Sequence, residues 1–111
     1  MSLPVPGSRP RGAGWYRAQL TRLLQGSGWQ VCAPEEAHAL LRQLMRERPE
    51  AAGLPLTVLA RDGAGDDVLI LHDAAPPEFR LVHLTWAEAD RGWQESRLIT
   101  DWADWARGLP R

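Results

Sequence analysis

Four consecutive apolar residues, VLIL at positions 68–71, constrain the fold more than any other feature of the chain. In a β-strand, successive side chains point to opposite faces, so Val68 and Ile70 share one face while Leu69 and Leu71 share the other. A strand that is apolar on both faces is typical of the centre of a sheet with cover on each side. We therefore expect the sheet to be built around a strand from Asp67 to His72.

Two further strands are predicted to flank this one. Residues 56–60 (LTVLA) are predicted to form the first strand, and the turn at 61–66 is rich in residues that accept a positive φ. A second reversal at 74–77 (AAPP) leads to a strand from Phe79 to Trp86. The pattern predicts a three-stranded antiparallel meander in chain order.

Apolar side chains at helical spacing predict two helices before the sheet. The first spans 13–25 and ends at a glycine pair, and the second begins at Pro34 and ends at Pro49. A short third helix is expected over 101–107, capped by Thr100 or Asp101, and Asp101 with Asp104 resembles a capping pair. The apolar stripe of the second helix consists of Ala37, Leu40, Leu41, Leu44 and Met45.

The fold class is thus predicted as α+β: two N-terminal helices, a three-stranded antiparallel meander and a short C-terminal helix. We expect the helices to cover one face of the sheet and other elements to cover part of the second face. Residues 29–32 form an extended link and a candidate fourth strand. Residues 1–12, rich in proline and glycine, are predicted to be a flexible tail, and 13–111 a single domain.

Composition indicates the source and compartment. All thirteen basic residues are arginine, and lysine and asparagine are absent, which is typical of a bacterial genome of high GC content. The single cysteine, Cys32, can form no disulfide within the chain, so a reducing cytoplasm is expected. The N-terminus lacks the apolar stretch of a secretory signal, and no apolar run is long enough to span a bilayer, so no membrane partner is predicted.

Charge bears on the kind of partner. The formal net charge is −1, which provides no general attraction to nucleic acid, so nucleic acid is not an expected partner. The charge is uneven, however: residues 1–48 carry +4 and residues 49–111 carry −5. Such asymmetry can mark a surface that binds another protein.

The residues that commonly perform catalysis or bind metals form no recognised pattern. His38, His72, His83 and Cys32 show no close paired spacing, and the aspartates that flank the central strand lie at its opposite ends. We therefore predict no catalytic, cofactor-binding or metal site. The alternative of an enzyme that uses His72 or His83 would require a carboxylate beside the histidine, in a cleft.

Six tryptophans are the main ambiguity in this sequence. Tryptophan dominates protein cores and interfaces alike. We expect Trp86, Trp102 and Trp105 to lie in the core. Partner binding is predicted at partly exposed tryptophans and at neighbouring arginines of an interface rim: Trp93, Trp29, Trp15, Arg91 and Arg97.

The last third of the chain resembles a pattern found in small bacterial proteins of no assigned function. The residues that carry it are FRLVHLTW at 79–86, Trp93, and ITDWADW at 99–105. In size these proteins are similar to accessory and immunity-type proteins, so the resemblance implies a partner-binding role and no particular reaction.

These observations favour a cytoplasmic bacterial protein-interaction module, either accessory or immunity-like, or a homo-oligomer. Two alternatives stay open. One is a small-ligand-binding module with a tryptophan-lined pocket between the sheet and the helices, and the other is the histidine-dependent enzyme.

Overall fold

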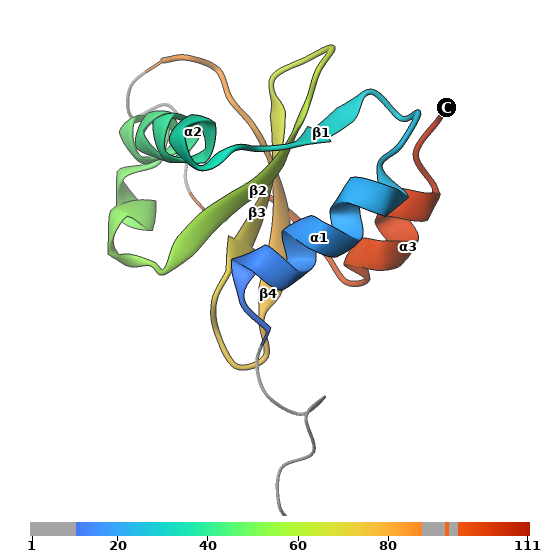
Figure 1. Cartoon of the computed structure of the whole chain (residues 1–111). Coiled ribbons are helices and arrows are strands. Elements are labelled where there is room, and N and C mark those ends of the chain that lie inside the picture. The colour runs from blue at the N-terminus through green and yellow to red at the C-terminus, as the bar shows by residue number, and fades with distance from the viewer. Residues whose placement is uncertain (1–10, 88–92, 94–95) are drawn as a thin grey trace, which may run out of the picture.

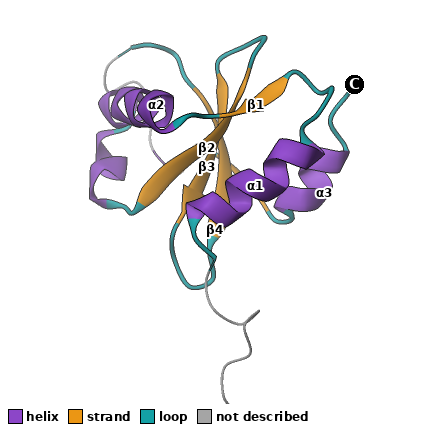
Figure 2. Ribbon diagram, in the orientation of Figure 1, coloured by secondary structure: helices purple, strands orange, loops and turns teal. Residues whose placement is uncertain are grey.

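A computed structural model describes residues 11–87, 93 and 96–111 of the chain (Figure 1). Over these residues the fold is α+β, as predicted, with three α-helices, one short 3-10 helix and one antiparallel sheet (Figure 2). None of the helices found there is both long and apolar enough to cross a membrane. The elements are α1 (Ala13–Leu23), β1 (Trp29–Val31), α2 (Pro34–Glu47), η2 (Pro49–Gly53), β2 (Leu56–Asp62), β3 (Asp67–His72), β4 (Glu78–His83), β5 (Arg97–Ile99) and α3 (Trp102–Arg107).

Within the part of the chain that the structure describes, the sheet has five strands in the order β1-β2-β3-β4-β5, so the prediction of three strands was incomplete. The candidate strand at 29–32 pairs with β2, and residues 97–99, where the sequence predicts no strand, pair with β4. Both added strands have only three residues and lie at the edges of the sheet. Strands this short carry too few alternating side chains for a pattern to reveal them.

Helices cover both faces of the sheet, which corrects the expectation that they share one face. In Figure 1, α2 lies against one face, while α1 and α3 lie side by side against the other. Two separate cores result. The core on the α2 side includes Leu40, Leu44, Val58, Val68, Ile70, Val82, Leu84 and Trp93. The core on the α1–α3 side includes Tyr16, Leu20, Leu59, Leu69, Leu71, Phe79, Ile99 and Ala106.

The central strand β3 behaves as its sequence predicts. Val68 and Ile70 belong to the α2-side core, and Leu69 and Leu71 belong to the other. A register shift between Val58 and Ala60 interrupts the pairing of β2 with β3, as an inserted residue in a β-bulge does. The shared strands thus divide their side chains between two hydrophobic layers.

The α1–α3 face is rich in aromatic contacts. Tyr16 packs edge-on against Phe79 and Trp102, with ring centroids 5.0 and 5.4 Å apart. The predicted cap of α3 is confirmed, because the Asp104 backbone N–H donates to the Asp101 carboxylate at 3.0 Å. The expected core positions of Trp102 and Trp105 are only partly realised, since both side chains are half-buried.

Cys32 is buried beneath α2, and this environment predicts its reactivity. Burial, together with repulsion from the Glu36 carboxylate, raises the pKa of the thiol to about 12. An unfolded chain ionises at its ordinary value of 9.0, so stability is lost as the pH rises from that value towards 12. We expect native protein to resist thiol-alkylating reagents at pH 8 and unfolded protein to react at once, as mass spectrometry after timed labelling would show.

Candidate interaction site

Trp86 is the most exposed of the large hydrophobic residues that the structure describes. Its side chain is 57% exposed, so the expectation that it belongs to the core is wrong. The physical reason is local: β4 ends at His83, and Trp86 adopts a φ of 63°. A left-handed conformation is rare for a bulky residue, and here the indole lies outside the core instead of continuing the alternation of Val82 and Leu84.

The Glu47 carboxylate holds this conformation in place. Glu47 lies in the last turn of α2 and is 0% exposed. One oxygen, Oε1, accepts hydrogen bonds from the backbone N–H of Thr85 at 2.7 Å and from the Thr85 hydroxyl at 3.0 Å. The other, Oε2, accepts from the Trp86 backbone N–H at 2.9 Å and from the Gln43 amide at 2.9 Å. Four donors thus converge on one buried carboxylate.

The ionised state of Glu47 follows from this geometry. Burial alone raises the pKa of the carboxyl group, because it removes water from the charge. The hydrogen bonds from Thr85, Gln43 and Trp86 act in the opposite direction and together outweigh burial, so the pKa lies below its ordinary value. At neutral pH the site therefore holds a buried anion. Three of its four hydrogen bonds fix residues 85 and 86, and the fourth comes from Gln43.

The exposed indole is fixed at its other end as well. The Trp86 Nε1–H donates to the Asp66 carboxylate at 3.0 Å, from the turn between β2 and β3. Beside the ring lies a small notch of about 60 Å³, lined by apolar Leu40, Val68 and Leu84 and by acidic Asp66 and Asp67. We call Trp86, Asp66, Asp67 and this notch the Trp86 surface.

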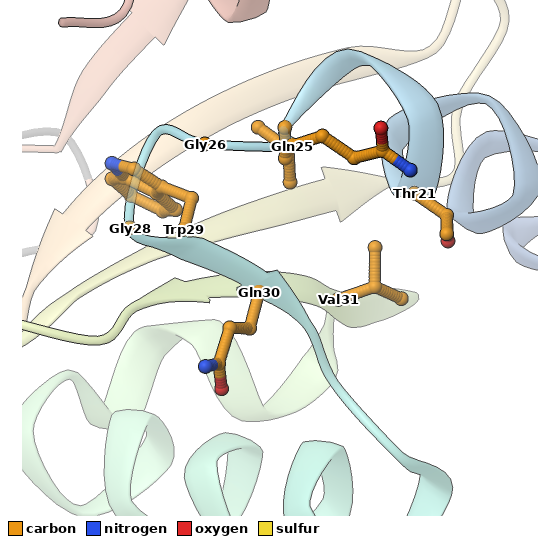
Figure 3. Close-up of a pocket in the computed structure, with 8 residues that line it drawn as sticks. Thr21, Gln25, Gly26, Gly28, Trp29, Gln30 and Val31 are labelled. Carbon is orange, nitrogen blue, oxygen red and sulfur yellow. The ribbon is translucent and has the colours of Figure 1, made fainter. Parts of the chain in front are cut away.

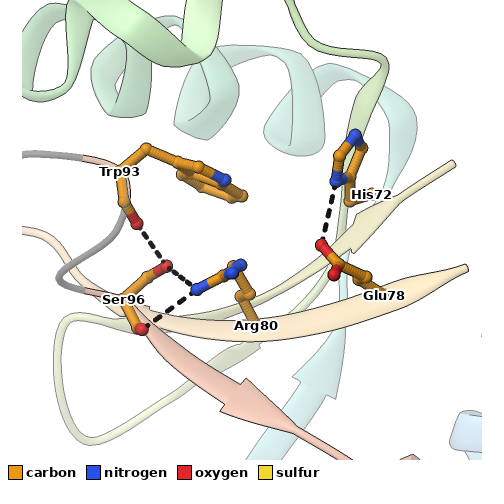
Figure 4. A network of polar contacts seen from close by, with 5 residues as sticks. All are labelled: His72, Glu78, Arg80, Trp93 and Ser96. Atoms are coloured by element: carbon orange, nitrogen blue, oxygen red, sulfur yellow. Dashed lines mark hydrogen bonds and ion pairs between the residues drawn. The ribbon is translucent and has the colours of Figure 1, made fainter. Parts of the chain in front are cut away.

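Trp93, the leading predicted anchor, is buried. Its side chain is 4% exposed within the α2-side core, so the expectation of an exposed ring is wrong. The Arg80 guanidinium lies 5.4 Å from the ring centroid and donates to the Ser96 carbonyl and hydroxyl (Figure 4). The Ser96 hydroxyl in turn donates to the Trp93 carbonyl at 2.7 Å, and the Trp93 backbone N–H donates to Glu50.

The other predicted partner residues do not gather on one surface. Trp15 is 38% exposed on α1, with the Arg11 guanidinium 4.7 Å from its ring centroid. Trp29 is half-buried on β1, edge-on against Trp105. Arg97 is exposed on β5 at the opposite edge of the sheet, and Arg91 lies outside the described residues.

Two histidines face carboxylates across β3 and β4. His72 Nδ1 lies 3.2 Å from Glu78 at one end, and His83 Nδ1 lies 2.8 Å from Asp67 at the other. In both cases the residues are register partners on neighbouring strands. The His83 side chain is 68% exposed, so water surrounds this pair, whose Asp67 belongs to the Trp86 surface. Over the described residues, no group of three or more potential ligands could hold a metal ion.

A wider cleft of about 390 Å³ lies between the end of α1 and the edge strand β1 (Figure 3). Figure 3 shows Thr21 and Gln25 on one side and Val31 on the other, with Trp29 near the glycine turn. This cleft is open to solvent along the sheet edge, unlike the predicted pocket between the sheet and the helices. Between the sheet and the helices, the buried apolar residues that the structure describes belong to the two cores.

Comparison with known proteins provides no assignment. Scans against protein-family models, curated proteins and solved structures each return no match.

The position of Glu47 in α2 indicates that its carboxylate is functionally or structurally special, although the sequence-based prediction did not include it. Glu47 extends the apolar stripe of α2, three residues after Leu44 and seven after Leu40. It also lies in the last helical turn, where the helix dipole disfavours an anion. A carboxylate at an inward-facing position, with the dipole against it, indicates a specific buried partner, although the sequence does not identify Thr85 and Trp86 as that partner.

The left-handed backbone at Trp86 predicts an unusual order of stabilities. Glycine accepts this conformation without strain, whereas alanine retains a penalty of about 1 kcal/mol. We expect Trp86→Gly to be more stable than Trp86→Ala by about that amount, as measured by urea denaturation. The reverse order is normal for an exposed residue, so it would show that residue 86 is not held left-handed in solution.

Proposed function

We propose that this protein is a non-catalytic protein-interaction module that docks its partner through the Trp86 surface. The observation that carries the proposal is an exposed indole fixed from two sides, by the Glu47 carboxylate behind its backbone and by Asp66 at its N–H. The proposal includes a bacterial cytoplasmic setting and an accessory or immunity-like role. The use of arginine for every basic residue supports the bacterial origin, and the sequence resemblance supports the role.

The energetic cost of this arrangement supports a binding role. A non-glycine residue at positive φ costs on the order of 1–3 kcal/mol, and such strain concentrates at functional sites. Burying a carboxylate is also costly unless it is fully hydrogen-bonded. Tryptophan is the residue most enriched among interface hot spots, and a ring that is already fixed loses little entropy on binding.

Site-specific photo-crosslinking in the native cells tests this proposal. A photoreactive phenylalanine analogue replaces Trp86 in one variant and Trp15 in a matched control, since both tryptophans are exposed. We expect a discrete adduct from position 86 and none from position 15. An adduct of twice 12.4 kDa would identify a second copy of the chain as the partner. Equal or absent crosslinking at both positions would contradict the proposal.

The cleft beside β1 supports a second candidate, a small-ligand-binding role. Its volume of about 390 Å³ lies within the range of ligand pockets, and Trp29 contributes an aromatic wall. A fragment screen followed by amide chemical shifts distinguishes the two functions. Saturable shifts of the Gln25 side-chain amide favour the ligand-binding role, whereas shifts confined to the Trp86 indole favour the interaction module.

A further inference from the structure

We propose that the Trp86 surface recognises an arginine side chain on the partner protein. This inference rests on the proposed interaction module and adds the chemistry of its partner. It starts from charge: the notch beside Trp86 is lined by two carboxylates, Asp66 and Asp67, and by one cation, Arg61. Arg61 is paired with Glu36 at 2.8 Å, and Asp67 lies 2.8 Å from His83 Nδ1. The notch therefore presents a net negative charge to an incoming group.

The aromatic ring of Trp86 is a second, independent reason to expect a cationic group on the partner. Trp86 is 57% exposed, and an exposed tryptophan ring attracts a cation that stacks on it. Trp15 shows the same preference within the chain, because Arg11 already lies against its ring. Trp86 is the more exposed of the two residues, so it is the one more accessible to a partner.

The size and shape of the notch favour arginine over a bulky apolar anchor. The notch volume of about 60 Å³ lies far below the range of small-molecule pockets and suits the end of one side chain. The planar guanidinium can stack on the indole while its N–H groups bond a carboxylate in a fork. Leu40 lines the same notch and would contact the methylene stem.

The predicted partner element is therefore an exposed arginine on a surface that is otherwise neutral or basic. A lysine offers the charge without the planar stacking and forked hydrogen bonding, so it should bind more weakly. The basic N-terminal half of a second copy has the required charge as well, and that occupant is distinguished by the mass of the crosslinked adduct.

Nuclear magnetic resonance of the six indole N–H groups tests the proposal on the full chain. The Trp86 signal is assigned as the one missing from Trp86→Leu. The probe is a five-residue peptide with a central arginine, and its control has citrulline, which keeps the shape without the charge. We expect the arginine peptide to shift the Trp86 signal saturably, with an affinity about fivefold above that of the citrulline peptide. The Trp15 signal should stay unchanged.

Asp66→Asn with Asp67→Asn provides the matched variant. The amide that Asp66→Asn introduces can still accept the indole N–H through its Oδ1, so the ring stays in place, and the other indole signals report whether the fold is intact. We expect this variant to bind the arginine peptide about fivefold more weakly and with less dependence on salt. Equal binding of the arginine and citrulline peptides, or an unaffected Trp86 signal, would overturn the proposal. If position 86 still gives a crosslinked partner, the interaction module stands and only its specificity for arginine is lost.

Discussion

Replacing Glu47 with alanine is expected to lower the free energy of unfolding by about 3 kcal/mol, because several donors lose their acceptor together. The backbone N–H groups of Thr85 and Trp86 are held only by this carboxylate among the contacts described, and each unsatisfied donor costs about 1–3 kcal/mol. Urea denaturation followed by circular dichroism would measure the loss. A loss under about 1 kcal/mol would show that water replaces the carboxylate at little cost.

Glu47→Gln is the matched control, because it keeps the shape and removes the charge. The folded pKa of Glu47 lies below its ordinary value of 4.5, so as the pH falls the unfolded chain takes up the proton first. The contribution of the carboxylate is therefore complete above that value and is lost in acid, as the pH falls through the folded pKa. As the pH falls, we expect the free energy of unfolding to decrease less for Glu47→Gln than for the native chain. Identical decreases would exclude a role for this group.

Trp93→Ala is expected to destabilise the protein by about 3–5 kcal/mol, the usual cost of removing a large aromatic side chain from a core. The ring lies in the α2-side core beneath Arg80, so its loss leaves a cavity and exposes the stacked guanidinium. Thermal denaturation would show a large fall in Tm. A fall of only a few degrees would mean that the ring is not packed in solution.

Trp15→Ala provides the comparison within the same residue type. Trp15 is exposed and contacts Tyr16 and Trp102 edge-on, so its loss should cost about 1 kcal/mol. The contrast between the two substitutions separates a structural tryptophan from a surface one. Similar losses at both positions would contradict the assignment of Trp93 to the core.

Much of the fold could be predicted from the sequence wherever the spacing of apolar side chains and the residues that bound an element indicated the same structure. The doubly apolar run at 68–71 placed β3 at the centre with cover on both sides, and Pro34 and Pro49 bounded α2. The aspartate cap of α3 was equally predictable, because it is a contact between residues three positions apart. Each of these features depends on neighbours in the chain.

The candidate site was not predicted, because it depends on contacts between distant residues. Nothing near Trp86 distinguishes it from a tryptophan that continues β4 into the core, yet Glu47, 39 positions earlier, turns the backbone outward. Trp93 was misjudged for the opposite reason. Its charged neighbours in the sequence suggested an interface rim, whereas Arg80 and the α2-side core enclose the ring itself.

The two cores on opposite faces of the sheet have a consequence for which substitutions this protein can tolerate during evolution. Glu47, Thr85 and Leu84 all belong to the α2 side, so the Trp86 surface depends on one hydrophobic layer. The aromatic layer between the sheet and α1 and α3 lies behind β3 and contributes no residue to that surface. Substitutions in the aromatic layer can therefore accumulate with effects on stability alone, whereas residues 47, 66 and 86 should be inherited or replaced together.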